Sequence, residues 1–192
     1  LPESLFELKD LVHLDLGNNQ LETLDNSVAT LKKLTHLDLG GNRIKKVEDL
    51  SLSNLKNLQY LNLSDVPEID WDNLLEQIFT FKKLQTLFIA NNNIAKVSPS
   101  IKQCQQIANL DISGNKLAAD KQEFWELMAA LPLLKSINLA NNNLQNVSNQ
   151  IKACSKLERI NLDNNSIEVV SDAFGELSNL QQLSLNQTAI KT

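Results

Sequence analysis

One spacing recurs along the whole chain. The pattern L-x-x-L-x-L-x-x-N-x-L occurs eight times in the 192 residues, at steps of 23 to 27 residues. Every copy has aliphatic residues at its first, fourth and sixth positions. The copies begin at Leu11, Leu34, Leu58, Leu84, Ile107, Leu134, Leu157 and Leu180. Self-similarity at a fixed period is the signature of a repeat architecture, in which each unit covers the apolar face of the next.

The fourth to sixth positions of each copy predict a short strand. In the first copy Leu14 and Leu16 alternate with Asp15, which is the period-two pattern of a strand with one buried face. His13, Asp15 and Gly17 would then point outward. Because a single strand cannot bury its leucines alone, neighbouring copies must stack into a parallel sheet.

Asparagine occupies the ninth position in six copies, as Asn19, Asn42, Asn92, Asn115, Asn142 and Asn165. A buried Asn amide can pair with backbone groups where the chain leaves the sheet, so stacked copies should form a ladder. Val66 and Thr188 interrupt this ladder. We expect an irregular turn at residues 64–69, and the departure leaves the register of the third copy open.

The second half of each repeat carries another apolar pattern, which indicates a core on the side opposite the strands. Two longer copies insert helix-spaced sequence, at residues 70–81 and 120–131. Asp120, followed three residues later by Glu, has the spacing of a capping box. We interpret Trp71 and Trp125 as core or helix-edge packing residues rather than functional ones, although Trp125 lies off the apolar stripe.

These copies resemble the leucine-rich repeat family. The resemblance covers essentially the whole chain, including a half repeat, LPESLFEL, before the first full copy. It implies an α/β fold, namely a leucine-rich repeat solenoid that forms a curved right-handed superhelix. Its parallel β-sheet would lie on the concave face, and short helices or turns on the convex face. Since no segment reads as a flexible linker, we expect residues 1–192 to form a single domain of about eight repeats, with the first and last incomplete.

Composition argues against several classes of partner. The formal net charge is −5, with Asp and Glu scattered among Lys, whereas a nucleic-acid-binding face would need a basic stripe. Binding to an anionic membrane is disfavoured for the same reason. No run of about 18 apolar residues could span a bilayer. Leu1 opens directly into a patterned segment, without a signal sequence. We therefore expect neither a nucleic-acid nor a membrane partner.

The two cysteines, Cys104 and Cys154, occupy the same repeat position, where the other copies carry Leu or Phe. Two ladder steps would place their Cα atoms about 10 Å apart, beyond the limit of about 7 Å for a disulfide. We predict two free thiols and favour the cytoplasm or another reducing compartment, with secretion left open. Asn-x-Ser/Thr triplets begin at Asn62, Asn146, Asn164 and Asn186, and a chain so rich in Asn forms them by chance.

The sequence offers little for catalysis. It has two His, no glycine-rich phosphate loop, no paired-cysteine metal spacing and no G-x-S-x-G motif. A nucleophile would need a base within hydrogen-bond reach, and neither cysteine has a predicted His nearby. We predict a protein that is not an enzyme and that needs no cofactor.

The outward residues of the strands are the candidate binding surface. Tyr60 and Phe88 are aromatic residues on an outward face in adjacent copies, and such residues are enriched among interface anchors. The alternative is that a turn near Val66 covers Phe88. The predicted partner-binding residues are His13, Asp15, His36, Asp38, Tyr60, Asn62, Phe88, Asp111 and Arg159.

Two His and two Asp on neighbouring strands could in principle hold zinc. His13 and His36 would be lateral neighbours, and Asp15 and Asp38 would pair in the same way. However, side chains on one sheet face project in parallel rather than converge, and Asp or Asn occupies the fifth position of the repeat in most copies, whether or not a His is nearby. We therefore interpret these residues as part of the repeat pattern and predict no metal site.

The favoured function is a protein-protein interaction module that binds a protein or peptide on its concave face. The alternative is the recognition segment of a larger enzyme or receptor, such as a ligase-type effector or a kinase-coupled sensor. The chain begins within a repeat and stops soon after Ile190 without polar caps, which fits a piece of a longer protein. Exposed core at either end would also allow self-association. Irregular repeat lengths argue against a consensus-designed scaffold.

Overall fold

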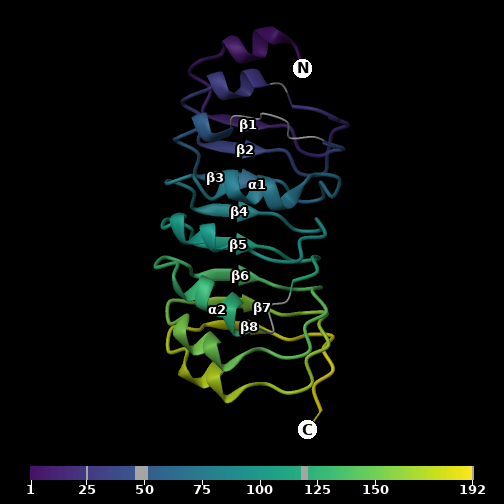
Figure 1. Cartoon of the computed structure of the whole chain (residues 1–192), viewed down its shortest axis with the longest axis vertical. Coiled ribbons are helices and arrows are strands. Elements are labelled where there is room, and N and C mark those ends of the chain that lie inside the picture. Colours follow the sequence, from purple (N-terminus) through teal and green to yellow (C-terminus); the bar gives the residue numbers. More distant parts are fainter. Residues whose placement is uncertain (25, 46–51, 118–120, 192) are drawn as a thin grey trace.

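A computed structural model of the chain describes residues 1–24, 26–45, 52–117 and 121–191. Within these residues, strands lie in chain order along the long axis of the molecule and form one parallel sheet (Figure 1). Its members are β1 (His13–Asp15), β2 (His36–Asp38), β3 (Tyr60–Asn62), β4 (Thr86–Phe88), β5 (Asn109–Asp111), β6 (Ser136–Asn138), β7 (Arg159–Asn161) and β8 (Gln182–Ser184). The solenoid with a parallel sheet that the family resemblance implied is confirmed.

The register follows the repeat. His13 pairs with His36, and Leu14 pairs with Leu37, so equivalent positions lie side by side at every step. The middle residue of each strand points into the core, because it is the aliphatic fourth position of the pattern. Tyr60 pairs with both His36 and Thr86, so the third repeat keeps the common register despite Val66.

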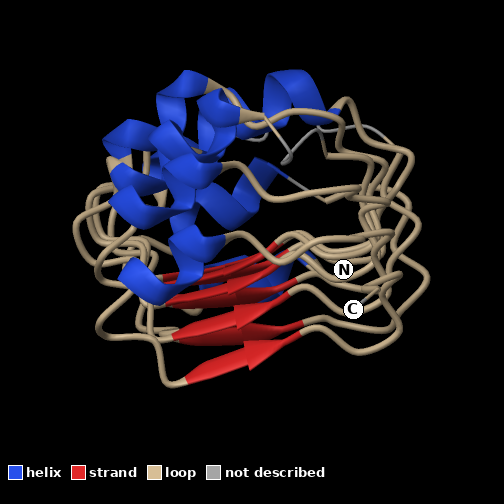
Figure 2. Ribbon diagram, turned by 90° about the horizontal axis from the view of Figure 1, so that it is seen from below, coloured by secondary structure: helices blue, strands red, loops and turns tan. Residues whose placement is uncertain are grey.

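Helices and turns cover the opposite side of the core, while the outer face of the sheet is left uncovered (Figure 2). The α-helices are α1 (Trp71–Ile78) and α2 (Gln122–Ala129). Short 3-10 segments fill the same place in the other repeats: η1 (Glu3–Glu7), η2 (Asn26–Thr30), η3 (Leu52–Asn54), η4 (Pro99–Gln103), η5 (Asn149–Ala153) and η6 (Asp172–Glu176). None of the helices in the described part of the chain has the length and apolar character needed to cross a bilayer.

Both predicted helices form, though each is shorter than its apolar pattern. Helix α1 begins after Asp70, whose side chain accepts a hydrogen bond from the backbone N–H of Asn73. Helix α2 begins after Lys121, and Asp120, the predicted capping residue, lies outside the described residues. Trp71 and Trp125 are both buried, which confirms their packing role, and Trp125 is 0% exposed.

The asparagine ladder is confirmed from the second repeat onward. Asn42, Asn92, Asn115, Asn142 and Asn165 are the buried polar residues of the described core. Where the ladder lacks an amide, the buried side chain of Val66 takes its place, and the Val66 N–H still donates to Asn92 Oδ1 at 2.7 Å. The irregularity predicted for residues 64–69 is confined to a turn and bend at 67–69.

The residue before the ladder position has a left-handed backbone in every repeat. The φ angles range from 52° to 65° at Asn18, Gly41, Asp65, Asn91, Gly114, Asn141, Asn164 and Gln187. Asn, Asp and Gly tolerate this region better than other residues, which explains their prevalence at the position. Asp65 shares the conformation, so the third repeat leaves the sheet in the same way as its neighbours.

The free state predicted for the two cysteines is confirmed, since Cys104 and Cys154 are unbridged and buried. Burial raises the pKa of each thiol to about 12. Each Sγ lies near a backbone carbonyl, that of Phe79 for Cys104 and that of Trp125 for Cys154. Both cysteines therefore behave as small core residues rather than nucleophiles.

We expect neither thiol of the native protein to react with iodoacetamide near neutral pH, and both to react after denaturation. Alkylation requires the thiolate, which is scarce far below a pKa of about 12 and is also sterically shielded. Intact-mass analysis before and after addition of a denaturant measures this directly. Rapid alkylation of the folded protein would contradict the burial of both side chains.

Candidate functional site

The outward side chains of β1–β8 form a surface that we call the sheet face; it is the face predicted to be concave. Four aromatic rings lie side by side across β1–β4. The ring centroids of His13 and His36 are 4.9 Å apart and those of His36 and Tyr60 are 5.6 Å apart, in stacked arrangements. The Phe88 ring meets Tyr60 edge-on at 5.5 Å. We call these four side chains the aromatic row.

The aromatic row is accessible. Tyr60 and Phe88 are half-buried by their neighbours on the sheet, and both line an open pocket. The turn after Val66 therefore leaves Phe88 in contact with solvent. Burial raises the pKa of Tyr60, and the negative charges of Asp38 and Asp15 raise it further. The phenol thus stays protonated near neutral pH and can donate a hydrogen bond.

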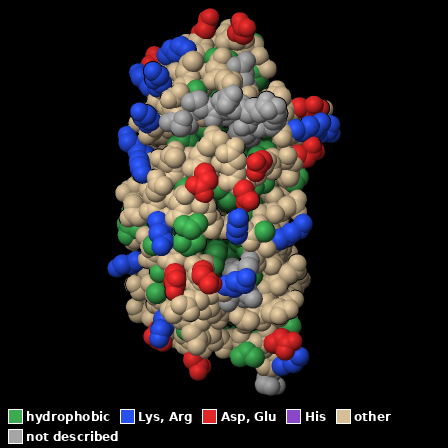
Figure 3. All heavy atoms as spheres, viewed as in Figure 1, with side chains coloured by type: hydrophobic (Ala, Val, Ile, Leu, Met, Phe, Trp, Pro, Cys, Tyr) green, Lys and Arg blue, Asp and Glu red, His purple; other side chains and the backbone are tan. Residues whose placement is uncertain are grey.

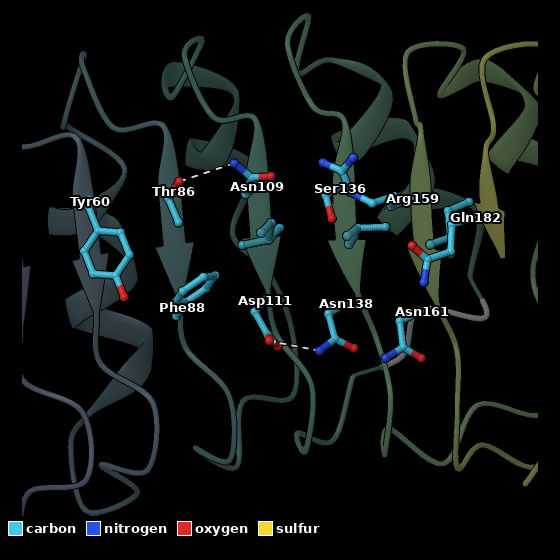
Figure 4. Close-up of a pocket in the computed structure, with 13 residues that line it drawn as sticks. Tyr60, Thr86, Phe88, Asn109, Asp111, Ser136, Asn138, Arg159, Asn161 and Gln182 are labelled. Carbon is cyan, nitrogen blue, oxygen red and sulfur yellow. Dashed lines mark hydrogen bonds between the residues drawn. The ribbon is translucent and has the colours of Figure 1, made fainter. Parts of the chain in front are cut away.

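The pocket has a volume of about 490 Å³ and lies over β3–β8. Tyr60 and Phe88 form one end of it, and polar side chains continue along the sheet (Figure 4). Its other labelled residues are Thr86, Asn109, Asp111, Ser136, Asn138, Arg159, Asn161 and Gln182. The surface combines a small apolar centre with many hydrogen-bonding groups, as protein-recognition surfaces commonly do.

The fifth position of each repeat, which is the last residue of each strand, forms the second outward column of the sheet face. Asp and Asn at this position have a structural role. Each accepts a hydrogen bond from the backbone N–H two residues later, which closes the turn where the strand ends. The side chains that do this are Asp15, Asp38, Asn62, Asp111, Asn138 and Asn161. They also connect neighbouring repeats, since Asn62 donates to Asp38 and Asn138 donates to Asp111.

Strand β4 departs from this arrangement. Phe88 stands where the neighbouring strands carry Asp or Asn, and it cannot accept the turn hydrogen bond. The backbone N–H of Ala90 is satisfied instead by Ser64 Oγ of the preceding repeat, at 3.1 Å. The Ser64 hydroxyl thus replaces the hydrogen-bond acceptor that the turn loses because Phe88 stands at this position. Ser64 was overlooked in the sequence because a contact between repeats is needed to give it meaning.

Arg159 and Asp111 are the charged side chains among the described residues that line the pocket. Asp111 is engaged: Oδ1 accepts from the Ser113 N–H and hydroxyl, and Oδ2 accepts from Asn138. Arg159 has one long ion pair, 3.7 Å from Nη1 to Glu158 Oε2. Its side chain comes from β7 and reaches back over β6 beside Ser136 (Figure 4). The guanidinium therefore has donors available for a ligand.

His13 and His36 lie side by side, as predicted, with their rings inclined by only 16°. Stacked imidazoles direct their ring nitrogens in parallel rather than toward one shared point. Across the described ranges, no group of three or more His, Cys, Asp or Glu side chains is placed to hold a metal ion. His36 Nδ1 instead lies 2.8 Å from the hydroxyl of Thr35.

Comparison with solved structures places this architecture among known repeat proteins. The leucine-rich repeat protein LIC12759 of Leptospira interrogans matches with a TM-score of 0.83 and 28% identity. That match covers 98% of this chain and 46% of LIC12759, so this chain spans less than half the length of that relative. No curated protein sequence gives a significant match.

Two receptors are also similar. The leucine-rich repeat ectodomain of the Arabidopsis thaliana membrane receptor kinase GASSHO1/SCHENGEN3, solved with CASPARIAN STRIP INTEGRITY FACTOR 2, gives a TM-score of 0.76 at 27% identity. TLR13, solved in complex with ssRNA13, gives 0.78 at 26% identity. These matches cover 98% and 96% of this chain, but 23% and 26% of the receptors.

Family models agree with the architecture. The model described as "Leucine rich repeat" matches residues 1–44 and 132–190. A second, described as "Leucine Rich repeats (2 copies)", matches residues 32–76. The chain therefore belongs to the leucine-rich repeat family, whose members are typically non-enzymatic modules for protein interaction.

Proposed function

We propose that this chain is a non-enzymatic interaction module that binds a protein or an extended peptide on the sheet face, with Tyr60 and Phe88 as anchors. The observation that carries the proposal is the exchange at β4. A solvent-facing Phe88 replaces a residue type that closes the turn elsewhere, and Ser64 takes over the turn hydrogen bond. Phe88 takes no part in closing the turn, and apart from its edge-on contact with Tyr60 its ring faces the open pocket, which favours a role in binding.

The polar residues around the anchors would set orientation and specificity. Arg159 offers a guanidinium for a carboxylate of the partner, and the Tyr60 hydroxyl offers a donor. His13 and His36 would extend the aromatic contact toward the first repeats. Asp15, Asp38, Asn62 and Asp111 would use the lone pairs that their turn hydrogen bonds leave free. Interfaces of this kind combine a desolvated aromatic centre with a hydrated polar rim.

Charge favours a protein or peptide over nucleic acid at this face. The outward columns carry carboxylates at Asp15, Asp38, Asp111 and Asp163, against the single arginine Arg159. A phosphate backbone would meet repulsion along most of the sheet. The ssRNA complex of TLR13 shows that the fold can serve a nucleic-acid receptor, but the side chains of this face do not favour that use.

Replacing Tyr60 and Phe88 together by Ala is expected to weaken the affinity for the partner at least about tenfold, since truncating an anchor residue typically costs well over 1 kcal/mol of binding free energy. The partner is first captured from native extract by the wild-type chain and identified by mass spectrometry. Affinity is then measured by calorimetry, with circular dichroism to confirm the fold. Leu133→Ala/Val169→Ala is the control, because both side chains are exposed and lie outside the pocket. Equal affinities for the two double variants would remove the anchors from the proposal.

The second candidate function is recognition within a larger enzyme or receptor. The chain spans 46% of LIC12759 and 23% of the GASSHO1/SCHENGEN3 ectodomain, so its relatives are longer. In such a protein the sheet face would choose the ligand, and another domain would act on the result. The complete reading frame discriminates between the two: a catalytic or membrane-anchoring domain beside these repeats favours the second.

For the compartment, the two free buried cysteines still favour a reducing one.

A further inference from the structure

A row of lysines follows the repeat along one flank of the first four repeats. Lys9, Lys32, Lys56 and Lys82 each stand two residues before the first leucine of their copy. The next position adds Lys33 and Lys83. We call these six residues the lysine ridge, and all of them are exposed. At this position the same flank carries one acidic side chain, Asp10, in these four repeats.

The lysine ridge is straight because equivalent positions of stacked repeats are in register. Successive strands lie about 4.8 Å apart, so its backbone positions span about 15 Å. Contacts cross from one repeat to the next: Lys33 pairs with Asp10 at 2.5 Å, and Lys83 Nζ donates to Asn57 at 2.8 Å. Figure 3 shows Lys and Arg side chains gathered along one long flank, whereas over the middle of this view and on the opposite flank they are interspersed with acidic side chains.

The net charge of −5 conceals this separation. Composition predicted no basic stripe, because it averages over the whole surface. The repeat instead places lysines of distant sequence positions in one line. Charges separated by more than about 8 Å are largely screened at physiological ionic strength, so a partner on this flank responds chiefly to the local lysines.

We propose that the lysine ridge docks the protein onto an anionic lipid surface, with the flank lying against phosphate-bearing headgroups. The ridge contains only lysines, which act as point charges and do not form the bidentate contacts of arginine. A straight, outward row can touch a plane of headgroups at every lysine. Clusters of four to eight basic residues bind anionic bilayers in this way.

Two features favour a lipid surface over nucleic acid on this flank. First, the equivalent position of the sixth repeat carries Pro132 and Leu133, both exposed, and Leu133 is 43% accessible. The fifth repeat, with Gln105 and Gln106 at these positions, separates Leu133 from the ridge, so the apolar side chain lies further along the same flank, where it fits the headgroup boundary. Secondly, Phe81, which precedes the lysine pair of the fourth repeat, is buried and leaves no ring for stacking on bases.

Docking along the flank is independent of the proposed use of the sheet face. The ridge precedes the strands, whereas Tyr60 and Phe88 point outward from the sheet itself. A docked molecule therefore keeps the pocket accessible from the side. The lipid surface would concentrate the module beside a membrane-bound partner without occupying its binding site.

Vesicle sedimentation tests the proposal with two charge-matched variants. The ridge variant is Lys32→Glu/Lys56→Glu/Lys82→Glu, and the control is Lys96→Glu/Lys116→Glu/Lys121→Glu, whose lysines are also exposed but lie after the strands. Each lysine at an anionic surface contributes a factor of about five to partitioning. With phosphatidylcholine/phosphatidylserine vesicles, we expect the ridge variant to partition about a hundredfold less than wild type. The control variant should lose less than about tenfold through net charge alone.

Four further results decide the matter. Binding should be absent with phosphatidylcholine alone and should weaken as salt rises. Equal losses in the two variants would overturn the proposal, because net charge and not the ridge would then be responsible. Binding to a fluorescent oligothymidylate without binding to anionic vesicles would also overturn it, in favour of nucleic acid. Circular dichroism and retained binding of the sheet-face partner show that each variant is folded.

Discussion

Replacing Asn115 by Ala is expected to lower the free energy of unfolding by about 3–5 kcal/mol. Its Oδ1 accepts hydrogen bonds from the buried N–H groups of Asn92 and Ile94, at 3.1 and 2.9 Å. Its Nδ2 donates to the carbonyls of Ile89, Ile112 and Ser113. Alanine leaves two backbone donors of the preceding repeat without an acceptor in a site that water does not reach, and each such group costs about 1–3 kcal/mol.

Asn19→Ala is the matched control for this ladder substitution. Asn19 holds the same repeat position but is exposed, and its Nδ2 donates to the carbonyls of Leu16 and Gly17 of its own turn. Water can replace these contacts, so the expected loss is below about 1 kcal/mol. Urea unfolding followed by circular dichroism measures both variants. Comparable losses for the two would mean that stability at this position does not depend on pairing between repeats.

The sequence alone was sufficient to predict the scaffold because the repeat encodes it several times over. Leu14, Leu37 and Leu110, the middle residues of β1, β2 and β5, are buried, as the period-two pattern predicts. The register followed from the same alignment, since stacked repeats bring equivalent positions together. Even Val66 did not shift it, because the backbone N–H at that position keeps its ladder hydrogen bond to Asn92. Eight copies of one signal leave little freedom for an alternative fold.

The candidate site was only partly predictable from the sequence. The outward position of Tyr60 and Phe88 followed from the strand register, but their edge-on contact depends on side-chain rotamers. The scaffold task of Asp15 and Asp38 was visible only as a residue preference, because its cause is a hydrogen bond to a backbone N–H. Ser64 accepts the turn hydrogen bond in place of the residue at position 88, which is 24 positions away in the sequence. This substitution can be recognised only once the repeats are stacked.

Deviation from the repeat is therefore the more useful guide to function in this chain. Residues that obey the pattern, such as Asn115 or Leu110, hold neighbouring repeats together. Phe88 departs from the Asp or Asn of the second outward column, and Ser64 of the preceding repeat accepts the turn hydrogen bond that Phe88 cannot accept. The lysine ridge arises differently, from positions that the pattern leaves free, where each of the first four repeats carries a lysine and, of the later repeats, the seventh alone does, with Lys156. Functional hypotheses in a repeat protein thus come from comparing the copies with one another.

Replacing Trp125 by Ala is expected to cost about 3–5 kcal/mol of stability, the range for truncating a buried aromatic residue. Trp125 is 0% exposed, and the Phe124 ring meets it edge-on at 5.2 Å. Helix α2 packs against η5, so a cavity at Trp125 loosens the contact between the fifth and sixth repeats. Glu126→Ala, on the exposed side of the same helix, should change stability by less than about 0.5 kcal/mol.

Hydrogen exchange would show where this stability is lost. In a stacked array each repeat depends chiefly on its neighbours, so Trp125→Ala should lower the protection of α2 and η5 far more than that of β1–β3. Uniform loss of protection along the sheet would mean that the array unfolds as one cooperative unit. Below the unfolding transition, the variant should bind the sheet-face partner with wild-type affinity, because Tyr60 and Phe88 lie on β3 and β4, away from the cavity. A stability defect without a binding defect, opposite to the pattern expected for Tyr60→Ala/Phe88→Ala, would separate the residues that build the scaffold from those that use it.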